Sequence, residues 1–213
     1  MWKAFKKFGF FLVVLIITLV IFGIIYLDKE SKQEVLEYAL KFRSSGKVLS
    51  TTEVMDIVKK YDFFDSAWNK DVYGFNNQFE VQTIKGDKIV MDRASGLIWQ
   101  HGGSNVTMTY DKAKEWIRGL NRTGYAGYYD WRLPTSDEAM SLVEPQKNES
   151  NLYIDFLFNK QQMMIWTSDM VKDEPWSWFV CFDEGGCRNA SLYENSSIYA
   201  CYVRAVRSAQ QKS

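Results

Sequence analysis

The chain has 213 residues, with 26 basic and 26 acidic side chains, three cysteines and one histidine. Its few prolines and glycines (3 and 13) exclude a collagen-like or low-complexity chain, and its 16% of aromatic residues is typical of a packed core. A single histidine, His101, argues against histidine-based metal centres, and a formal net charge of zero gives no support for nucleic-acid binding.

Charge and hydropathy separate the first 28 residues from the rest of the chain. Residues 1–27 contain three lysines and no acidic residue, so the remaining 23 basic and 26 acidic side chains carry a net charge of −3. The stretch from Phe8 to Leu27 is uncharged, and as a helix it would span roughly 30 Å, the thickness of a bilayer core. We therefore predict a cytoplasmic stub and a transmembrane helix within residues 1–28.

The same stretch has an alternative interpretation as a cleaved secretory signal. Such a signal usually has an apolar region of about 7–15 residues, followed by small residues at a cleavage site. The apolar stretch here is longer, and residues 26–30, YLDKE, offer no such site. Lysines before the span and mixed charge after it indicate a cytoplasmic N-terminus. We expect an uncleaved single-pass anchor, with the residues after Asp28 in the periplasm or outside the cell.

The connecting segment, residues 29–78, is predicted to be mainly helical. Apolar residues at helical spacing predict an amphipathic helix from Val35 to Arg43. The sequence from Ser50 to Glu53 is a capping box and predicts the start of a second helix, and residues 62–77 are interpreted as an ordered loop. We interpret the segment as a spacer packed on the domain that follows, with oligomerisation beside the membrane as the alternative.

Residues 79–208 are predicted to form a globular domain, followed by a short tail at 209–213. Alternating residues predict strands at 79–84 and 88–92, joined by a turn that contains Gly86. A short buried strand is predicted at 96–99. The domain is therefore expected to begin with a β-hairpin and one further strand.

The second part of this domain is predicted to contain two helices and three more strands. Apolar residues at helical spacing predict a helix over about 110–120. The capping box from Thr135 to Glu138 opens a second helix, which Pro145 ends. The remaining strands are predicted at 164–168, 178–182 and 201–206. Two helices followed by a small antiparallel sheet indicate the α+β class.

Several motifs carry a resemblance to a known family. They are VMDRASGLIWQ (90–100), GYAGYYDWRLPT (124–135), EAMSLVEP (138–145), IWTSD (165–169) and YVRAVR (202–207). In this order they resemble the Lcl C-terminal domain family, over about residues 76–208. The resemblance implies a C-type-lectin-like fold, largely unknown function, and a distant similarity to formylglycine-generating enzymes. Some relatives are adhesins for sulfated polysaccharides, a ligand class that the net charge of −3 disfavours here.

The residues of these motifs are interpreted as structural: Asp92, Gly96, Trp99, Trp131, Arg132, Pro134, Thr135, Arg204 and Arg207. Large apolar residues beside short elements usually pack in the core, which applies to both tryptophans. Arg132 lies between two apolar residues, so we expect a carboxylate or carbonyl partner for its planar guanidinium. Arg204 and Arg207 are three residues apart on a predicted strand, so one is expected to brace the fold and the other to face solvent.

The three cysteines allow more than one arrangement. All would lie outside the membrane, where a disulfide is permitted. Cys187 and Cys201 flank a polar segment that would gain most from a covalent link, so we predict a disulfide between them. Cys181 is then a buried thiol. The alternatives are a Cys181–Cys187 disulfide or three buried thiols. Cysteines also suggest a copper-dependent oxidase like the formylglycine-generating enzymes, and this is the least favoured function.

The predicted function is recognition rather than catalysis. Residues 169–178 show no strand period, and an exposed Trp176 beside Asp169 and Lys172 would suit a sugar face, although Trp176 packed on the core is an equal alternative. Glu144-Pro145-Gln146 resembles a lectin calcium motif but lacks the other oxygen ligands that calcium needs. We therefore expect no catalytic residue, cofactor or metal, and a polysaccharide or an envelope protein as partner. A structural or assembly protein of the envelope is the alternative.

Overall fold

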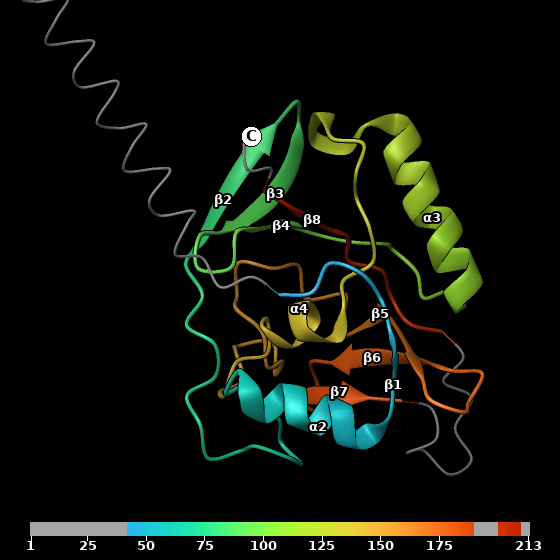
Figure 1. Cartoon of the computed structure of the whole chain (residues 1–213). Helices are drawn as coiled ribbons and strands as arrows, with labels where there is room; N and C mark the ends of the chain where they lie inside the picture. The colour runs from blue at the N-terminus through green and yellow to red at the C-terminus, as the bar shows by residue number, and fades with distance from the viewer. Residues whose placement is uncertain (1–41, 190–199, 210–213) are drawn as a thin grey trace, which may run out of the picture. The chain divides into compact units, whose positions relative to one another are not determined.

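The structure is a computed structural model that describes residues 42–189 and 200–209, all within one compact unit, Leu40–Ser213. Among these residues, no helix has the length and apolar character needed to cross a membrane. The predicted transmembrane helix over Phe8 to Leu27 and most of the first amphipathic helix lie outside the described residues. Figure 1 shows the arrangement of the described elements.

The first four-stranded sheet has the order β1-β5-β6-β7. Its strands are β1 (Val48–Leu49), β5 (Met164–Val171), β6 (Ser177–Cys181) and β7 (Gly186–Arg188). The pairs β5–β6 and β6–β7 are antiparallel, with Ile165 opposite Val180, whereas β1 runs parallel to β5. All five residues of β6 are buried, because both faces of this sheet are covered.

The second four-stranded sheet has the order β2-β3-β4-β8 and is antiparallel throughout. Its strands are β2 (Phe79–Ile84), β3 (Asp87–Asp92), β4 (Leu97–Gln100) and β8 (Val206–Ser208). A two-residue turn joins β2 and β3, and Lys85 and Gly86 both have positive φ (52° and 89°). This is the twist that two-residue hairpin turns require, and it confirms the predicted hairpin.

Helices are few and mostly short in the described part of the chain. They are α2 (Thr51–Lys60), α3 (Tyr110–Thr123), the 3-10 helix η1 (Tyr125–Gly127) and α4 (Ser136–Met140). Both predicted capping boxes are present: the side chains of Ser50 and Thr135 accept hydrogen bonds from the backbone amides of Glu53 and Glu138. α3 ends at Gly124, whose φ of 69° suits the left-handed cap.

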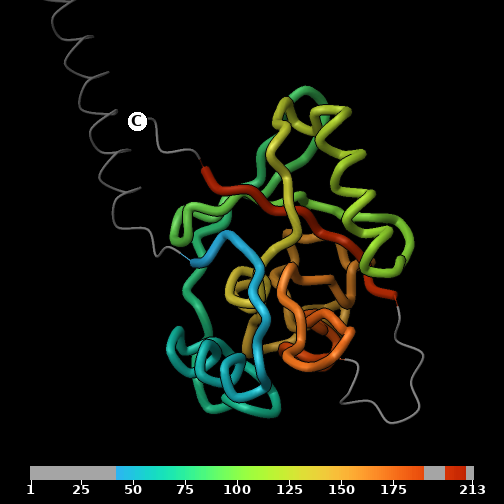
Figure 2. The backbone as a smooth tube through the Cα atoms, turned by 45° about the vertical axis from the view of Figure 1, so that its right-hand side comes forward, coloured from blue at the N-terminus to red at the C-terminus, as the bar shows by residue number. Residues whose placement is uncertain are grey.

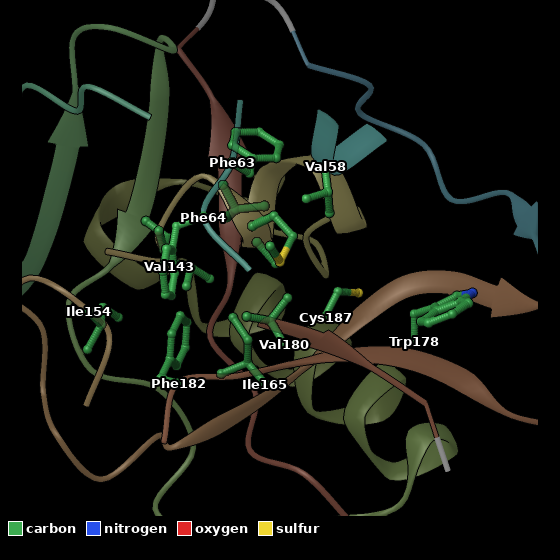
Figure 3. Close-up of a cluster of buried hydrophobic side chains, with 14 of the residues drawn as sticks. Val58, Phe63, Phe64, Val143, Ile154, Ile165, Trp178, Val180, Phe182 and Cys187 are labelled. Atoms are coloured by element: carbon green, nitrogen blue, oxygen red, sulfur yellow. The ribbon is translucent and has the colours of Figure 1, made fainter. Parts of the chain in front are cut away.

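Two hydrophobic clusters lie on opposite faces of the first sheet. The first gathers side chains from α2, α4, the adjacent loops and part of the second sheet, and Figure 3 shows Val58, Phe63, Val180 and Cys187 converging in it. The second contains residues of α3, η1 and the second sheet, together with Trp131. Alternate residues of β6 enter different clusters, because successive side chains of a strand point to opposite faces.

The C-terminal segment, residues 200–209, connects the two sheets. Figure 2 shows this segment in red, crossing the domain. Tyr202 is bridged to Ile165 of β5, and the amide of Trp166 donates to the Tyr202 carbonyl at 3.1 Å. A few residues later, β8 pairs with β4, with Arg207 opposite Ile98. One short segment therefore supplies backbone hydrogen bonds to both sheets.

The predicted fold class is wrong. We expected an α+β, C-type-lectin-like domain with two helices and one small antiparallel sheet, whereas the described chain is mainly β, with two sheets of four strands. The predicted helix after Thr135 contains only five residues, and the apolar Leu142 and Val143 reach the core from the turns that follow. The strands β1 and β7 are only two and three residues long, too short to show alternation.

Candidate functional site

The predicted ligand-contact residues are not brought together as an exposed site. β5 continues to Val171 and β6 begins at Ser177, so only a tight connection remains between them. Asp169 is fully buried within β5, Lys172 is exposed, and Trp176 is half-buried against the first cluster. Asp169 therefore cannot contact a ligand at the surface. The strand at 164–168 was predicted, but its continuation to Val171 was missed, because the buried side chains of Thr167 and Asp169 are polar and break the apolar alternation.

Asp169 belongs instead to a buried ionic network with Arg43 and Asp137. Arg43 Nη1 donates to Asp169 Oδ1 at 2.8 Å, and Arg43 Nε donates to Asp137 Oδ1 at 3.1 Å. The backbone amides of Lys47 and Ser136 also donate to Asp169, each at 2.7 Å. Burial by itself raises the pKa of Asp169, but the hydrogen bonds from Arg43 and these amides outweigh it and lower this pKa.

The WRLPT motif forms a structural corner. Arg132 Nη1 and Nη2 donate to Glu138 Oε2 and Oε1, both at 2.6 Å, which is the carboxylate partner expected for this arginine. Glu138 Oε2 also accepts from the Thr135 amide at 2.9 Å, and the Ser168 amide donates to the Pro134 carbonyl at 2.6 Å. All of these donors and acceptors therefore form hydrogen bonds within the domain.

The tryptophans and the turn before β4 are structural as well. Trp99 and Trp131 are buried, as expected, and Trp131 Nε1 donates to the Tyr125 carbonyl at 3.0 Å. Asp92 is buried and accepts hydrogen bonds from the backbone amides of residues 78 and 94 and from the Ser95 hydroxyl. Gly96 takes a φ of 68° between β3 and β4, a conformation that favours glycine.

The expected difference between Arg204 and Arg207 is wrong, because both are buried. β8 begins only at Val206, and Arg204 precedes it in the segment that crosses the domain. Arg207 pairs with Asp130 (Nε to Oδ1, 2.7 Å). Arg204 donates to backbone carbonyls at positions 102 and 159, and burial lowers its pKa to about 9.

The three cysteines are free and buried, so the predicted disulfide between Cys187 and Cys201 is not present. The reason is their placement: Cys187 lies in the first hydrophobic cluster, whereas Cys181 and Cys201 lie in the second. Burial raises the pKa of all three thiols. Because the thiolate is the reactive form, these are structural cysteines.

An open pocket of about 330 Å³ lies elsewhere, where the loop before β2 meets the turns after α4. Its lining combines aromatic rings, amides and two carboxylates: Tyr73, Gly74, Phe75, Asn76, Asn77, Phe79, Glu144 and Asp155. We call this the Tyr73 pocket. The loop can be followed in Figure 1 from the end of α2 to β2.

Backbone and side-chain contacts fix the walls of the Tyr73 pocket. Asn77 Nδ2 donates to the Ser141 carbonyl at 2.7 Å, which ties the loop to the turn after α4. Gly74 has a φ of 76°, and a Cβ at this position would lie 3.4 Å from Pro145. The ring of Phe79 packs edge-on against Phe158, with centroids 5.1 Å apart. The pocket is therefore held by the fold rather than by exposed loops alone.

The ionisable groups of the Tyr73 pocket are acidic apart from the tyrosine itself, since none of its lining residues is Lys, Arg or His. Burial raises the pKa of Glu144, and the nearby charge of Asp155 raises it further. In the described parts of the chain, no group of three or more His, Cys, Asp or Glu is placed to hold a metal ion. Chemically, the pocket offers flat apolar faces beside hydrogen-bond acceptors and donors.

Sequence reasoning missed this pocket because its two walls are far apart in the chain. Residues 62–77 were predicted as a loop, which is correct, but nothing local relates that loop to Glu144 or Asp155. The one available signal was composition: Tyr73 to Phe79 contains three aromatic residues and two asparagines, an unusual mixture for a plain connector.

Comparison with known proteins gives one match. A family model described as the Lcl C-terminal domain matches residues 88–207, more than half of the chain. Searches among curated proteins and among solved structures found no match. The matched range includes the WRLPT corner and the Glu144 and Asp155 side of the pocket, whereas the Tyr73 side precedes it.

Proposed function

We propose a binding function for this chain, which belongs to the Lcl C-terminal domain family. In this proposal it is a membrane-anchored, non-enzymatic protein that holds one saccharide unit of a polysaccharide in the Tyr73 pocket. The domain would face the periplasm or the cell exterior, so that its ligand is a component of the envelope or of the surroundings.

The composition of the Tyr73 pocket carries this proposal. The side chain of Tyr73 is 96% exposed, so its ring presents a flat apolar face that needs no rearrangement to receive a sugar ring. Asn76, Glu144 and Asp155 line the same pocket and offer donors and acceptors to sugar hydroxyls. Polar side chains and aromatic rings thus share the lining, a mixture suited to a ligand with both hydroxyl groups and apolar ring faces.

The anchor is supported by the uncharged span from Phe8 to Leu27 and by the lysines that precede it. A reporter enzyme fused after Ser213 tests this part of the proposal. A reporter that works only after export should be active at this position. Activity of a reporter that works only in the cytoplasm would contradict the proposed topology.

A non-enzymatic role is supported by the state of the cysteines. A thiol-based oxidase needs accessible, easily ionised thiols, and here burial raises the pKa of all three. Because glycan hydrolysis generally uses two carboxyl groups and two line this pocket, hydrolysis of a bound glycan is the enzymatic activity to test. Release of new reducing ends during incubation with an oligosaccharide ligand would contradict the non-enzymatic part of the proposal.

The binding experiment uses the full chain in detergent, tested on a glycan array and then by calorimetric titration with the polysaccharides that bind. Tyr73→Ala should weaken binding about tenfold, because an aromatic contact of this kind contributes about 1–2 kcal/mol. Tyr129→Ala is the matched control, since Tyr129 is also exposed but does not line the pocket. Equal affinities for wild type and Tyr73→Ala would contradict the proposal.

A further inference from the structure

We infer that the saccharide held in the Tyr73 pocket is an amino sugar with a free, positively charged amino group. This inference rests on the proposed function and narrows its ligand class. Sulfated, carboxylated and N-acetylated sugars are disfavoured by the same reasoning. Two features of the pocket point to a cation: its carboxylates and its aromatic rings.

The first feature is the pair of acidic side chains. Glu144 and Asp155 line the pocket together, and no basic residue lines it with them. Two carboxylates at one site repel each other, and an ammonium group between them relieves that repulsion. Both are partly buried, so their attraction for a cation is weakened less by solvent than that of an exposed pair. An anionic sugar would instead be repelled by the two carboxylates.

The second feature is the aromatic content of the pocket. Tyr73, Phe75 and Phe79 all line it, and the faces of aromatic rings attract cations as well as sugar rings. Aromatic rings combined with carboxylates are suited to organic ammonium groups, because such groups have a charge and also carbon-bound hydrogens beside it. A small hydrated metal cation would gain nothing from the rings.

The experiment compares two ligands that share one backbone. The full chain in detergent is titrated with oligomers of glucosamine and with oligomers of N-acetylglucosamine of the same length, in near-neutral buffer, where the pocket carboxylates are ionised and part of the free amines is protonated. We expect the glucosamine oligomer to bind at least about tenfold more tightly, the size of one charge-assisted hydrogen bond. A lysine homopolymer serves as a charged ligand without sugar.

Three isosteric variants locate the effect. Glu144→Gln and Asp155→Asn should each reduce the preference for the glucosamine oligomer about tenfold. The control is Glu149→Gln, since Glu149 is exposed and lies outside the pocket lining. Melting curves of all three identify any variant that fails to fold, and the remaining pocket variant then decides the result.

The outcomes separate the inference from the proposed function. Equal affinities for the two sugar oligomers, both reduced by Tyr73→Ala, would overturn the inference and leave the proposed function standing. Failure of both oligomers and of every array glycan to bind would overturn the proposed function. A preference for the glucosamine oligomer that survives Glu144→Gln and Asp155→Asn, or equal binding of the lysine homopolymer, would also overturn the inference.

Discussion

At the scale of single residues, arginine–carboxylate pairs brace this domain, and all but Arg132–Glu138 join residues far apart in the chain. The pairs are Arg43 with Asp137 and Asp169, Arg132 with Glu138, Arg188 with Asp65, and Arg207 with Asp130. In the first three cases the carboxylate is almost fully buried. Removing the arginine would leave an unpaired buried charge, which costs far more than the pair itself contributes.

Arg132→Ala tests the corner at the start of α4. The variant leaves Glu138 buried without its bidentate partner, so we expect the free energy of unfolding to fall by about 2–4 kcal/mol. Arg132→Lys should recover only part of this loss, because an ammonium group cannot make two parallel hydrogen bonds. Denaturant unfolding of the full chain in detergent measures both. Wild-type stability in Arg132→Ala would show that the pair is dispensable.

The cysteines provide a second test at this scale. Cys181, Cys187 and Cys201 are buried thiols with raised pKa values, so alkylation of the native protein should be much slower than alkylation in denaturant. Mass spectrometry after a timed reaction with iodoacetamide counts the modified thiols. A thiol that reacts equally fast in both states, or a disulfide found by non-reducing peptide mapping, would contradict the structure.

At the scale of elements, the segment of residues 42–49 acts as a strap over the first sheet. Its last two residues form β1, which pairs with β5, and Arg43 reaches the two buried carboxylates. The strap passes so close to β5 that a Cβ on Gly46 would lie 2.1 Å from the Ser168 carbonyl oxygen. Residues 42–49 are thus an integral part of the domain.

Arg43→Met should destabilise the domain by about 3–5 kcal/mol near neutral pH, because Asp137 and Asp169 lose their shared partner. Lys47→Ala is the control, since only the backbone amide of Lys47 contacts Asp169. Denaturant unfolding of the full chain measures the difference. Equal losses in the two variants would contradict the role given to the Arg43 guanidinium.

The pH dependence of the same variant follows from the Asp169 pKa, which is lowered in the folded protein. A lowered carboxyl pKa contributes stability above the unfolded-state value, and this contribution is lost as the pH falls through the folded-state value. The gap between wild type and Arg43→Met should therefore be widest near neutral pH and shrink in acid. If the difference in stability between wild type and Arg43→Met did not change with pH, lost packing rather than the lost charge would explain the destabilisation.

At the scale of the whole domain, the two sheets are expected to unfold together. The first sheet lies between both hydrophobic clusters, and residues 200–209 are hydrogen-bonded to both sheets. Such contacts shared between the two sheets make unfolding cooperative. Tryptophan fluorescence and circular dichroism of the full chain should give the same midpoint for the domain. Two separate midpoints would show that the sheets are independent units.

The sequence by itself determined the features that depend on neighbouring residues. Both capping boxes, the turn at Lys85 and Gly86, and the apolar stripe of α3 were predicted because backbone hydrogen bonds and side-chain periodicity act over a few residues. Alternation along a strand also explains why Cys181 lies in the second cluster while Trp178 and Val180 lie in the first. The resemblance to the family was recognised from several short motifs that occur in the same order along the chain.

Only the tertiary structure decided which distant segments meet. Arg43 lies 94 residues from Asp137 and 126 from Asp169, and Tyr73 is similarly remote from Glu144 and Asp155, yet each set forms one site. The fold class also depended on β1 and β7, whose pairing comes from neighbouring strands rather than from their own two or three residues. Such contacts are selected by the packing of the whole core, and no local pattern in the chain records them.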